Sequence, residues 1–223
     1  MIRARLAAAL CIALPAAAQD YVSVPEGPLP DEDFYRLVAC SAPPGGACKD
    51  PIVRWPAAVA ANLTVGVVAV DPDFPTSRQA LIRDALSNAI DEINAADVGL
   101  VLRRPPDGTR PDIAVHLVAL TENARLDGSI DPELEGVEIG AGYVHVWWNS
   151  RAEITRAIIL FARDIRREDI PSIVLEELVQ AMGLLTDIDN RWYTTRSIFA
   201  ENGNTLTRLQ PQDIMALRRH YAE

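Results

Sequence analysis

IPSIVLEELVQAMG, residues 170–183, is the most informative stretch of this chain. Pro171 suits the first turn of a helix, Gly183 suits its end, and Asp169 is placed to cap it. The residues between them are apolar nearly all round, which predicts a helix that is buried in the protein.

Three polar residues interrupt this apolar helix. At about 100° per residue, Glu176 and Gln180 lie about 40° apart, and Glu177 lies about 60° from Gln180. An unpaired buried carboxylate is costly, so this cluster is expected to meet hydrogen-bonding partners, solvent or a metal ion.

Residues 176–187, EELVQAMGLLTD, resemble the metzincin motif HExxHxxGxxHD. In that motif three histidines hold zinc and the glutamate is the general base. Glu177 matches the base, Gly183 the turn glycine and Asp187 the final acid. The three histidine positions hold other residues, so the resemblance implies no zinc site: Glu176, Gln180 and Thr186.

The resemblance extends over residues 60–223. In matrixins an edge strand that carries substrate precedes the active-site helix, and Tyr143–Trp148 is similar to it. Ser197–Phe199 is similar to the Met-turn, with phenylalanine in place of methionine, and residues 209–221 are similar to the closing helix. The whole pattern also resembles a bacterial exported domain family of unknown function, with a Glu-Glu-x-x-Gln helix in place of His-Glu-x-x-His.

The resemblance implies a zincin-like pseudoenzyme. We expect a non-catalytic binding or structural protein of the cell envelope, which keeps the cleft for a peptide or protein ligand. The alternative is a metal-dependent peptidase with Glu177 as the general base. Its ligands would be the oxygens of Glu176, Gln180 and Asp187, which suit calcium, magnesium or manganese rather than zinc. A lesser alternative is a secreted inhibitor or chaperone-like partner of a true protease.

Structural explanations of the polar residues are also open. Glu177 would be paired with Arg191 or Arg196, and the rest of the cluster would form a satisfied hydrogen-bond network. No two histidines have the i, i+4 spacing of a metal site, so we expect structural or surface roles for all three: His116, His145 and His220.

The rest of the chain predicts an α+β domain with a mixed sheet. Residues 63–70 are β-branched and apolar, typical of a strand. An amphipathic helix follows from Thr76, with Gln79 completing a capping box. Further strands are expected at 100–102, 112–118, 143–148 and 158–162. We assign this zincin-like domain to residues 57–223.

Residues 19–56 are predicted to form an N-terminal extension. Its first part, 19–33, is rich in Pro, Asp and Glu and is expected to be an exposed leader. Cys40 and Cys48 flank a loop of turn-forming residues, so a local disulfide is predicted.

Residues 1–18 have the features of a signal peptide. Arg3 and Arg5 precede an apolar run that is too short to span a bilayer, and Ala16–Ala18 supplies a cleavage site. The rival interpretation is a lipoprotein modified at Cys11. We expect export to the periplasm or the medium, and no later membrane span.

Cleavage would remove two arginines and no acids. Lys and Arg would fall from 21 to 19 against 31 Asp and Glu, a net charge of −12. Such an acidic protein repels phosphate backbones, so nucleic acid is not expected as a partner.

Overall fold

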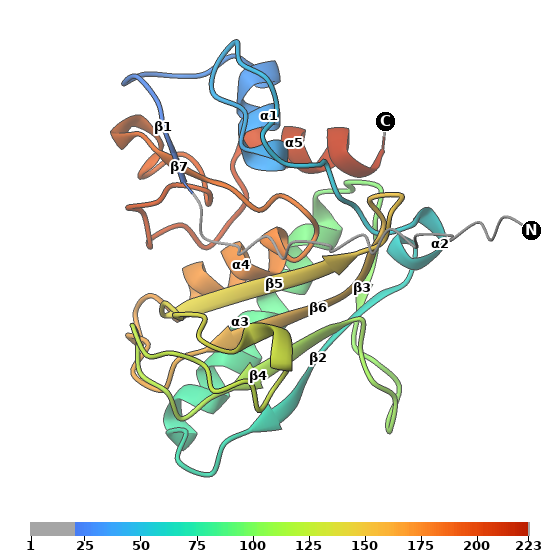
Figure 1. The fold of residues 1–223 in the computed structure, drawn as a ribbon, viewed down its shortest axis with the longest axis vertical. Coiled ribbons are helices and arrows are strands. Elements are labelled where there is room, and N and C mark those ends of the chain that lie inside the picture. The colour runs from blue at the N-terminus through green and yellow to red at the C-terminus, as the bar shows by residue number, and fades with distance from the viewer. Residues whose placement is uncertain (1–20, 223) are drawn as a thin grey trace, which may run out of the picture.

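A mixed five-stranded sheet is the centre of the fold in the computed structural model, which describes residues 21–222 (Figure 1). The strand order is β3-β2-β4-β6-β5. The first four of these strands are parallel, whereas β5 is antiparallel to β6 and forms an edge. The strands are β2 (Leu63–Val70), β3 (Leu102–Arg103), β4 (Ile113–Leu117), β5 (Gly142–Trp148) and β6 (Ile154–Phe161).

Two helices cover one face of this sheet, α3 (Thr76–Ala95) and α4 (Ile170–Gln180). Successive side chains of a strand point to opposite faces, so alternate residues of β4 meet different partners. Ile113, Val115 and Leu117 join the large core under the helices, whereas Ala114 joins a smaller core on the other face. The loop 121–140, with the 3-10 turn Pro132–Leu134, covers part of that second face.

Most of the remaining elements gather beyond the β5 edge of the sheet, apart from α2 (Figure 1). Helix α1 (Asp31–Cys40) packs against α5 (Pro211–Tyr221), and β1 (Tyr21–Ser23) pairs in parallel with β7 (Asp187–Asp189). The short helix α2 (Ala57–Ala60) and the 3-10 turn η2 (Arg191–Tyr193) complete the described chain.

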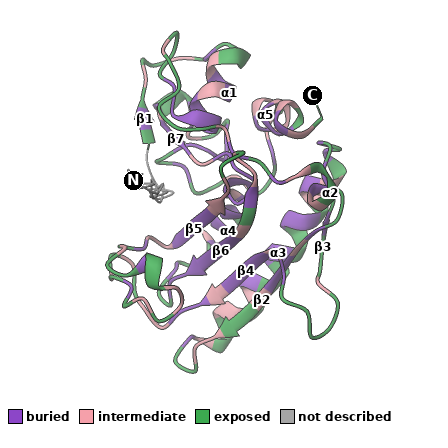
Figure 2. Cartoon of the chain, turned by 45° about the vertical axis from the view of Figure 1, so that its right-hand side comes forward, coloured by how far each residue is buried: buried purple, intermediate pink, exposed green. Residues whose placement is uncertain are grey.

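The predicted α+β class with a mixed sheet, an amphipathic helix, a buried helix and a C-terminal helix is confirmed. Figure 2 shows that β4, β5, β6 and α4 are largely buried. The predicted capping box at the start of α3 is wrong. Pro75 rather than Thr76 is the N-cap of α3, and Gln79 donates to the Phe74 carbonyl instead. Asp169 is the N-cap residue of α4, as predicted, but its side chain makes no capping bond.

Most of the described residues of the expected leader, 21–33, are exposed, but part of the segment packs against the rest of the chain. Tyr21–Ser23 forms a strand, and Val22 and Leu29 are only 7% and 9% exposed. Phe34, in the predicted extension, packs against Phe199 in the same large core as the sheet. The boundary between residues 56 and 57 stays a prediction.

The signal segment 1–18 and Cys11 lie outside the described residues. Between residues 21 and 222, no helix combines the length and apolar character needed to cross a membrane.

The predicted disulfide between Cys40 and Cys48 is confirmed. It closes a short loop at the end of α1. The double variant Cys40→Ala/Cys48→Ala is expected to lose about 2–3 kcal/mol of unfolding free energy, because its unfolded chain is less constrained. Urea unfolding would measure the loss, and wild-type protein under reducing conditions should match the variant. A variant as stable as the oxidised protein would contradict this role.

Candidate functional site

Helix α4 brings Glu176 and Glu177 to a cavity of about 240 Å³. Glu177 is 5% exposed and Gln180 is 2% exposed, while Glu176 is only partly buried. We call this hollow the carboxyl cavity, because four of its lining residues are acids. It is lined by Tyr21, Ala141, Gly142, Ile173, Glu176, Glu177, Asp187, Glu201 and Asn204.

The start of β5 lies against Glu177, because α4 packs against β5. A Cβ atom at Gly142 would be 2.3 Å from Glu177 Oε1, so a side chain here would force the Glu177 carboxyl group to shift. The other oxygen, Oε2, is buried and has no hydrogen-bond partner among the described residues. Buried polar atoms are nearly always paired, so this atom requires an explanation.

The other two acids of the cavity are Asp187, on strand β7, and Glu201, in the segment after this strand. Ile188 donates from its N–H to the Phe199 carbonyl at 2.7 Å, and Glu201 donates to the Ile188 carbonyl at 3.1 Å. This pairing places Glu201 beside β7. On the other side of β7, β1 pairs Tyr21 with Asp187. The cavity is therefore assembled from segments that are far apart in the sequence.

Burial and neighbouring carboxyl groups raise the pKa values of all four cavity acids. Burial, then Asp187, raises the pKa of Glu177 well above its usual value, and burial, Asp187, Glu177 and Glu201 do the same for Glu176. Burial and Glu201 raise the pKa of Asp187 to about 8, although a bond from Gln180 opposes the shift. Burial and Asp189 raise the pKa of Glu201. The cluster therefore favours protonated carboxyls.

The expected pairing of Glu177 with Arg191 or Arg196 is wrong. Within residues 21–222, no ion pair involves any of the four cavity acids. The Arg196 guanidinium lies over the Trp192 ring and donates to the Trp192 carbonyl instead.

The three positions that correspond to zinc ligands do not fit zinc. Gln180 Nε2 donates to Asp187 Oδ1 at 2.9 Å, and Thr186 Oγ1 is 2.8 Å from Ser41 Oγ. Both side chains are thus held by protein partners, and only Glu176 of the three lines the carboxyl cavity. In the described part of the chain, no three His, Cys, Asp or Glu residues are grouped so that they could hold a metal ion.

The segment similar to a Met-turn is locked to the closing helix. Ser197 Oγ donates to Asp213 Oδ1 at 2.7 Å, and the Ile198 N–H donates to Asp213 Oδ2 at 3.2 Å. Asp213 also accepts from the Gln210 N–H in a capping box at the start of α5. Phe199 is fully buried, so this segment supports the cavity without lining it.

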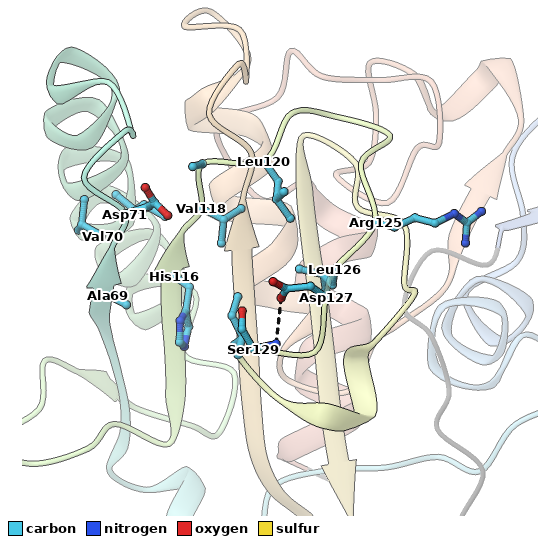
Figure 3. A pocket seen from close by; sticks show the side chains of 13 residues that line it. Ala69, Val70, Asp71, His116, Val118, Leu120, Arg125, Leu126, Asp127 and Ser129 are labelled. Atoms are coloured by element: carbon cyan, nitrogen blue, oxygen red, sulfur yellow. Dashed lines mark hydrogen bonds between the residues drawn. The ribbon is translucent and has the colours of Figure 1, made fainter.

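A second hollow, of about 330 Å³, lies at the carboxyl ends of β2 and β4 (Figure 3). Asp71, His116 and Asp127 are among its lining residues, and Arg125 points away to bond Glu138 at 3.0 Å. Burial, then Arg110, lowers the pKa of His116. Asp127 is exposed and accepts from the Ser129 N–H. Because its acids are solvated or bonded, this hollow lacks the unpaired buried atom that marks the carboxyl cavity.

The other two histidines have structural surroundings. His145 lies on β5, where its Nδ1 is 3.2 Å from the Tyr143 hydroxyl. His220 is buried in α5, with Nε2 2.9 Å from the Val53 carbonyl. Burial lowers the pKa of His220 to about 4, so its neutral form predominates at neutral pH.

Of the predicted cluster, the structure brings Glu176, Glu177 and Asp187 to one cavity and directs Gln180 and Thr186 elsewhere. Sequence reasoning missed Tyr21, Gly142 and Glu201. The Gly-Tyr start of the β5 strand was a usable signal, because glycine marks a close approach. Nothing local in the sequence indicated Tyr21 or Glu201.

One family matches most of the chain. No curated protein matches this chain. The family described as "Protein of unknown function (DUF2927)" matches residues 38–223, which include α4, β5, β7 and all the cavity residues except Tyr21. The chain therefore belongs to the DUF2927 family.

Proposed function

We propose that this protein is a non-catalytic binding protein of the cell envelope. In this proposal the chain is exported by its signal peptide, has a degenerate zincin-like fold and uses the cleft at the carboxyl cavity to hold a peptide or protein ligand. The observation that carries the proposal is the buried, unpartnered Oε2 of Glu177 in a cavity of carboxyl groups. Such an atom suits recognition of a ligand group.

The position of β5 supports a peptide or protein as the ligand. This strand forms an edge of the sheet, and its first residue, Gly142, lines the carboxyl cavity. A sheet edge offers backbone groups to an extended chain, while a neighbouring pocket selects its side chain. The cleft thus combines both elements of peptide recognition.

The side chains at the positions that correspond to zinc ligands support binding rather than metal-assisted hydrolysis. A general base acts on a water molecule that must be activated, and zinc normally supplies that activation. Here Gln180 and Thr186 are engaged with Asp187 and Ser41. The side chains around Glu177 therefore do not fit an activating zinc ion, which favours a ligand contact for this carboxyl group.

Metal analysis of the mature protein, residues 19–223, tests this proposal. The protein would be dialysed against zinc, manganese and calcium in turn, and its metal content and peptidase activity measured. We expect no stoichiometric metal and no turnover that depends on Glu177. Metal bound at one equivalent and lost in Glu176→Ala, together with peptide hydrolysis lost in Glu177→Gln, would overturn it in favour of a peptidase.

A further inference from the structure

We propose that the carboxyl cavity binds an organic cation, a primary ammonium or guanidinium group, which displaces protons from the cluster as it enters. This inference rests on the proposed binding function and names the chemistry that its ligand presents. The same head groups occur on peptide side chains and on free amines, and the experiment separates these sources.

The unpartnered Oε2 atom of Glu177 is the first step of the argument. Glu177 is 5% exposed, and its Oε1 faces Gly142. Leaving a buried acceptor unpaired costs about 1–3 kcal/mol, and more when the group is charged. The cavity that Glu177 lines is the space from which a donor can reach it.

The charges around Glu177 Oε2 favour a positively charged donor over a neutral one. The groups that act electrostatically on the cavity acids are themselves acids: Glu177, Asp187, Asp189 and Glu201. The nearby Tyr143 hydroxyl has its pKa raised to about 12 by burial and by Glu177, so it stays neutral. No ion pair offsets the cavity acids within residues 21–222. A cation is therefore the ligand that relieves their mutual repulsion.

The spacing of the acids favours an organic cation over a metal ion. A calcium ion needs six to eight oxygens that converge to about 2.3–2.6 Å from one point. The described acids form no such group. An ammonium group has three donors and a guanidinium has five, and both reach acceptors that are spread around a cavity.

The walls of the cavity suit the aliphatic chain that carries an ammonium or guanidinium group. Ile173 and Ala141 supply apolar contact, and the Tyr21 ring, 54% exposed, lies among the lining residues. Aliphatic stems pack on apolar walls while their charged ends meet acceptors, and aromatic faces attract cations. A volume of about 240 Å³ lies below the usual range for a drug-sized ligand, so one side chain fits better than a whole molecule.

The test uses n-butylammonium and n-butylguanidinium as probes, with n-butanol and butyrate as matched controls. Titration into isotopically labelled protein should shift the amide signals of Gly142 and Glu201 with both cations and with neither control. Calorimetry in two buffers of different ionisation enthalpy should show proton release on binding. Affinity for the two cations should rise with pH, because the carboxyl groups hold their protons less tightly at higher pH.

Matched variants locate the binding. Glu177→Gln keeps the shape and removes the charge, and is expected to weaken cation binding about 10-fold or more. Glu135→Gln removes one exposed charge in the loop 121–140 and should bind as wild type. Glu201→Gln, at an exposed position, gives a second test if Glu177→Gln fails to fold. Binding by Glu177→Gln and Glu201→Gln as tight as that of wild type, or equal shifts with n-butanol, would overturn the inference.

A second arm identifies the source of the cation. A blocked Ala-Lys-Ala peptide that binds more tightly than n-butylammonium indicates a peptide ligand, whereas equal affinity indicates a free amine. Failure of all cations to bind would remove this inference but not the proposed function, which is decided by metal content and turnover.

Discussion

Replacing Gly183 with alanine is expected to lower the unfolding free energy by about 3 kcal/mol or more, which makes it one of the most damaging single changes in this chain. Gly183 ends the α4 region with φ of +99°, a conformation that costs energy for any residue with a Cβ. The added Cβ would also lie 2.1 Å from the Val53 carbonyl oxygen, which is backbone and cannot rotate away.

The same collision would disturb the contacts that close the end of α4. The Val53 oxygen is 2.9 Å from His220 Nε2, the Trp55 indole donates to the Ala181 carbonyl, and the Tyr221 hydroxyl donates to the Met182 carbonyl. Thermal unfolding should show a drop of about 6–12 °C for a domain of this size.

Gly136→Ala is the matched control for this prediction. Gly136 has φ of +80°, and nothing lies within 4 Å of an added Cβ. Gly136→Ala should lower the unfolding free energy by about 1–2 kcal/mol, which is the cost of backbone strain alone. Equal losses in the two variants would show that strain, rather than the collision with Val53, explains the role of Gly183.

Asp187→Asn is expected to stabilise the protein increasingly as pH rises, by about 2 kcal/mol or more at pH 9. The pKa of Asp187 is about 8 in the folded protein, against a usual 3.8. Asparagine keeps the oxygen that accepts from Gln180 and removes the charge that the other acids oppose. Thermal unfolding from pH 4 to pH 9 would measure the difference between variant and wild type.

The sign follows from proton binding. Well below the usual pKa of 3.8, at about pH 3 and under, Asp187 is protonated in the folded and unfolded states and the variant gains little. Between about pH 4 and pH 8 the unfolded chain releases the proton while the folded protein keeps it, so wild-type stability falls as pH rises. Asp213, with a pKa of about 6, and His220, with a pKa of about 4, titrate in both proteins and cancel in the difference.

Asp189→Asn controls for charge removal on the same strand. Asp189 lies two residues further along β7, is less buried and accepts from Ser23 Oγ at 2.7 Å. This variant leaves Asp187 in place, so the pH-dependent gain expected for Asp187→Asn should not appear in it. A gain for Asp187→Asn that stays constant from pH 4 to pH 9 would contradict the raised pKa of Asp187.

The sequence predicts well the parts of the structure that depend on local pattern. The apolar run 63–70 and the helix 170–183 become β2 and α4, because burial on one or all faces leaves a periodicity that can be read directly. The adjacent acids Glu176 and Glu177 could also be predicted as site residues, because they interrupt this apolar pattern. The capping of α3 was not, because Gln79 bonds to Phe74 instead of completing a box with Thr76.

The parts that depend on distant pairing could not be predicted. Tyr21 reaches Asp187 because β1 pairs with β7 across most of the chain, and three-residue strands carry almost no periodic signal. Glu201 reaches the cavity through two backbone bonds at Ile188. That no arginine within residues 21–222 pairs with Glu177 is likewise a property of three-dimensional placement, since Arg191 and Arg196 are near in sequence.

The pairing of β1 with β7 has a practical consequence for anyone who produces this protein. Tyr21 begins β1 and lines the carboxyl cavity, so a purification tag or fluorescent label joined just ahead of it would start at the mouth of that cavity. Attachment after α5 avoids this problem, because the far end of that helix contributes nothing to the lining. Immobilisation for interaction screening should therefore use the carboxyl terminus.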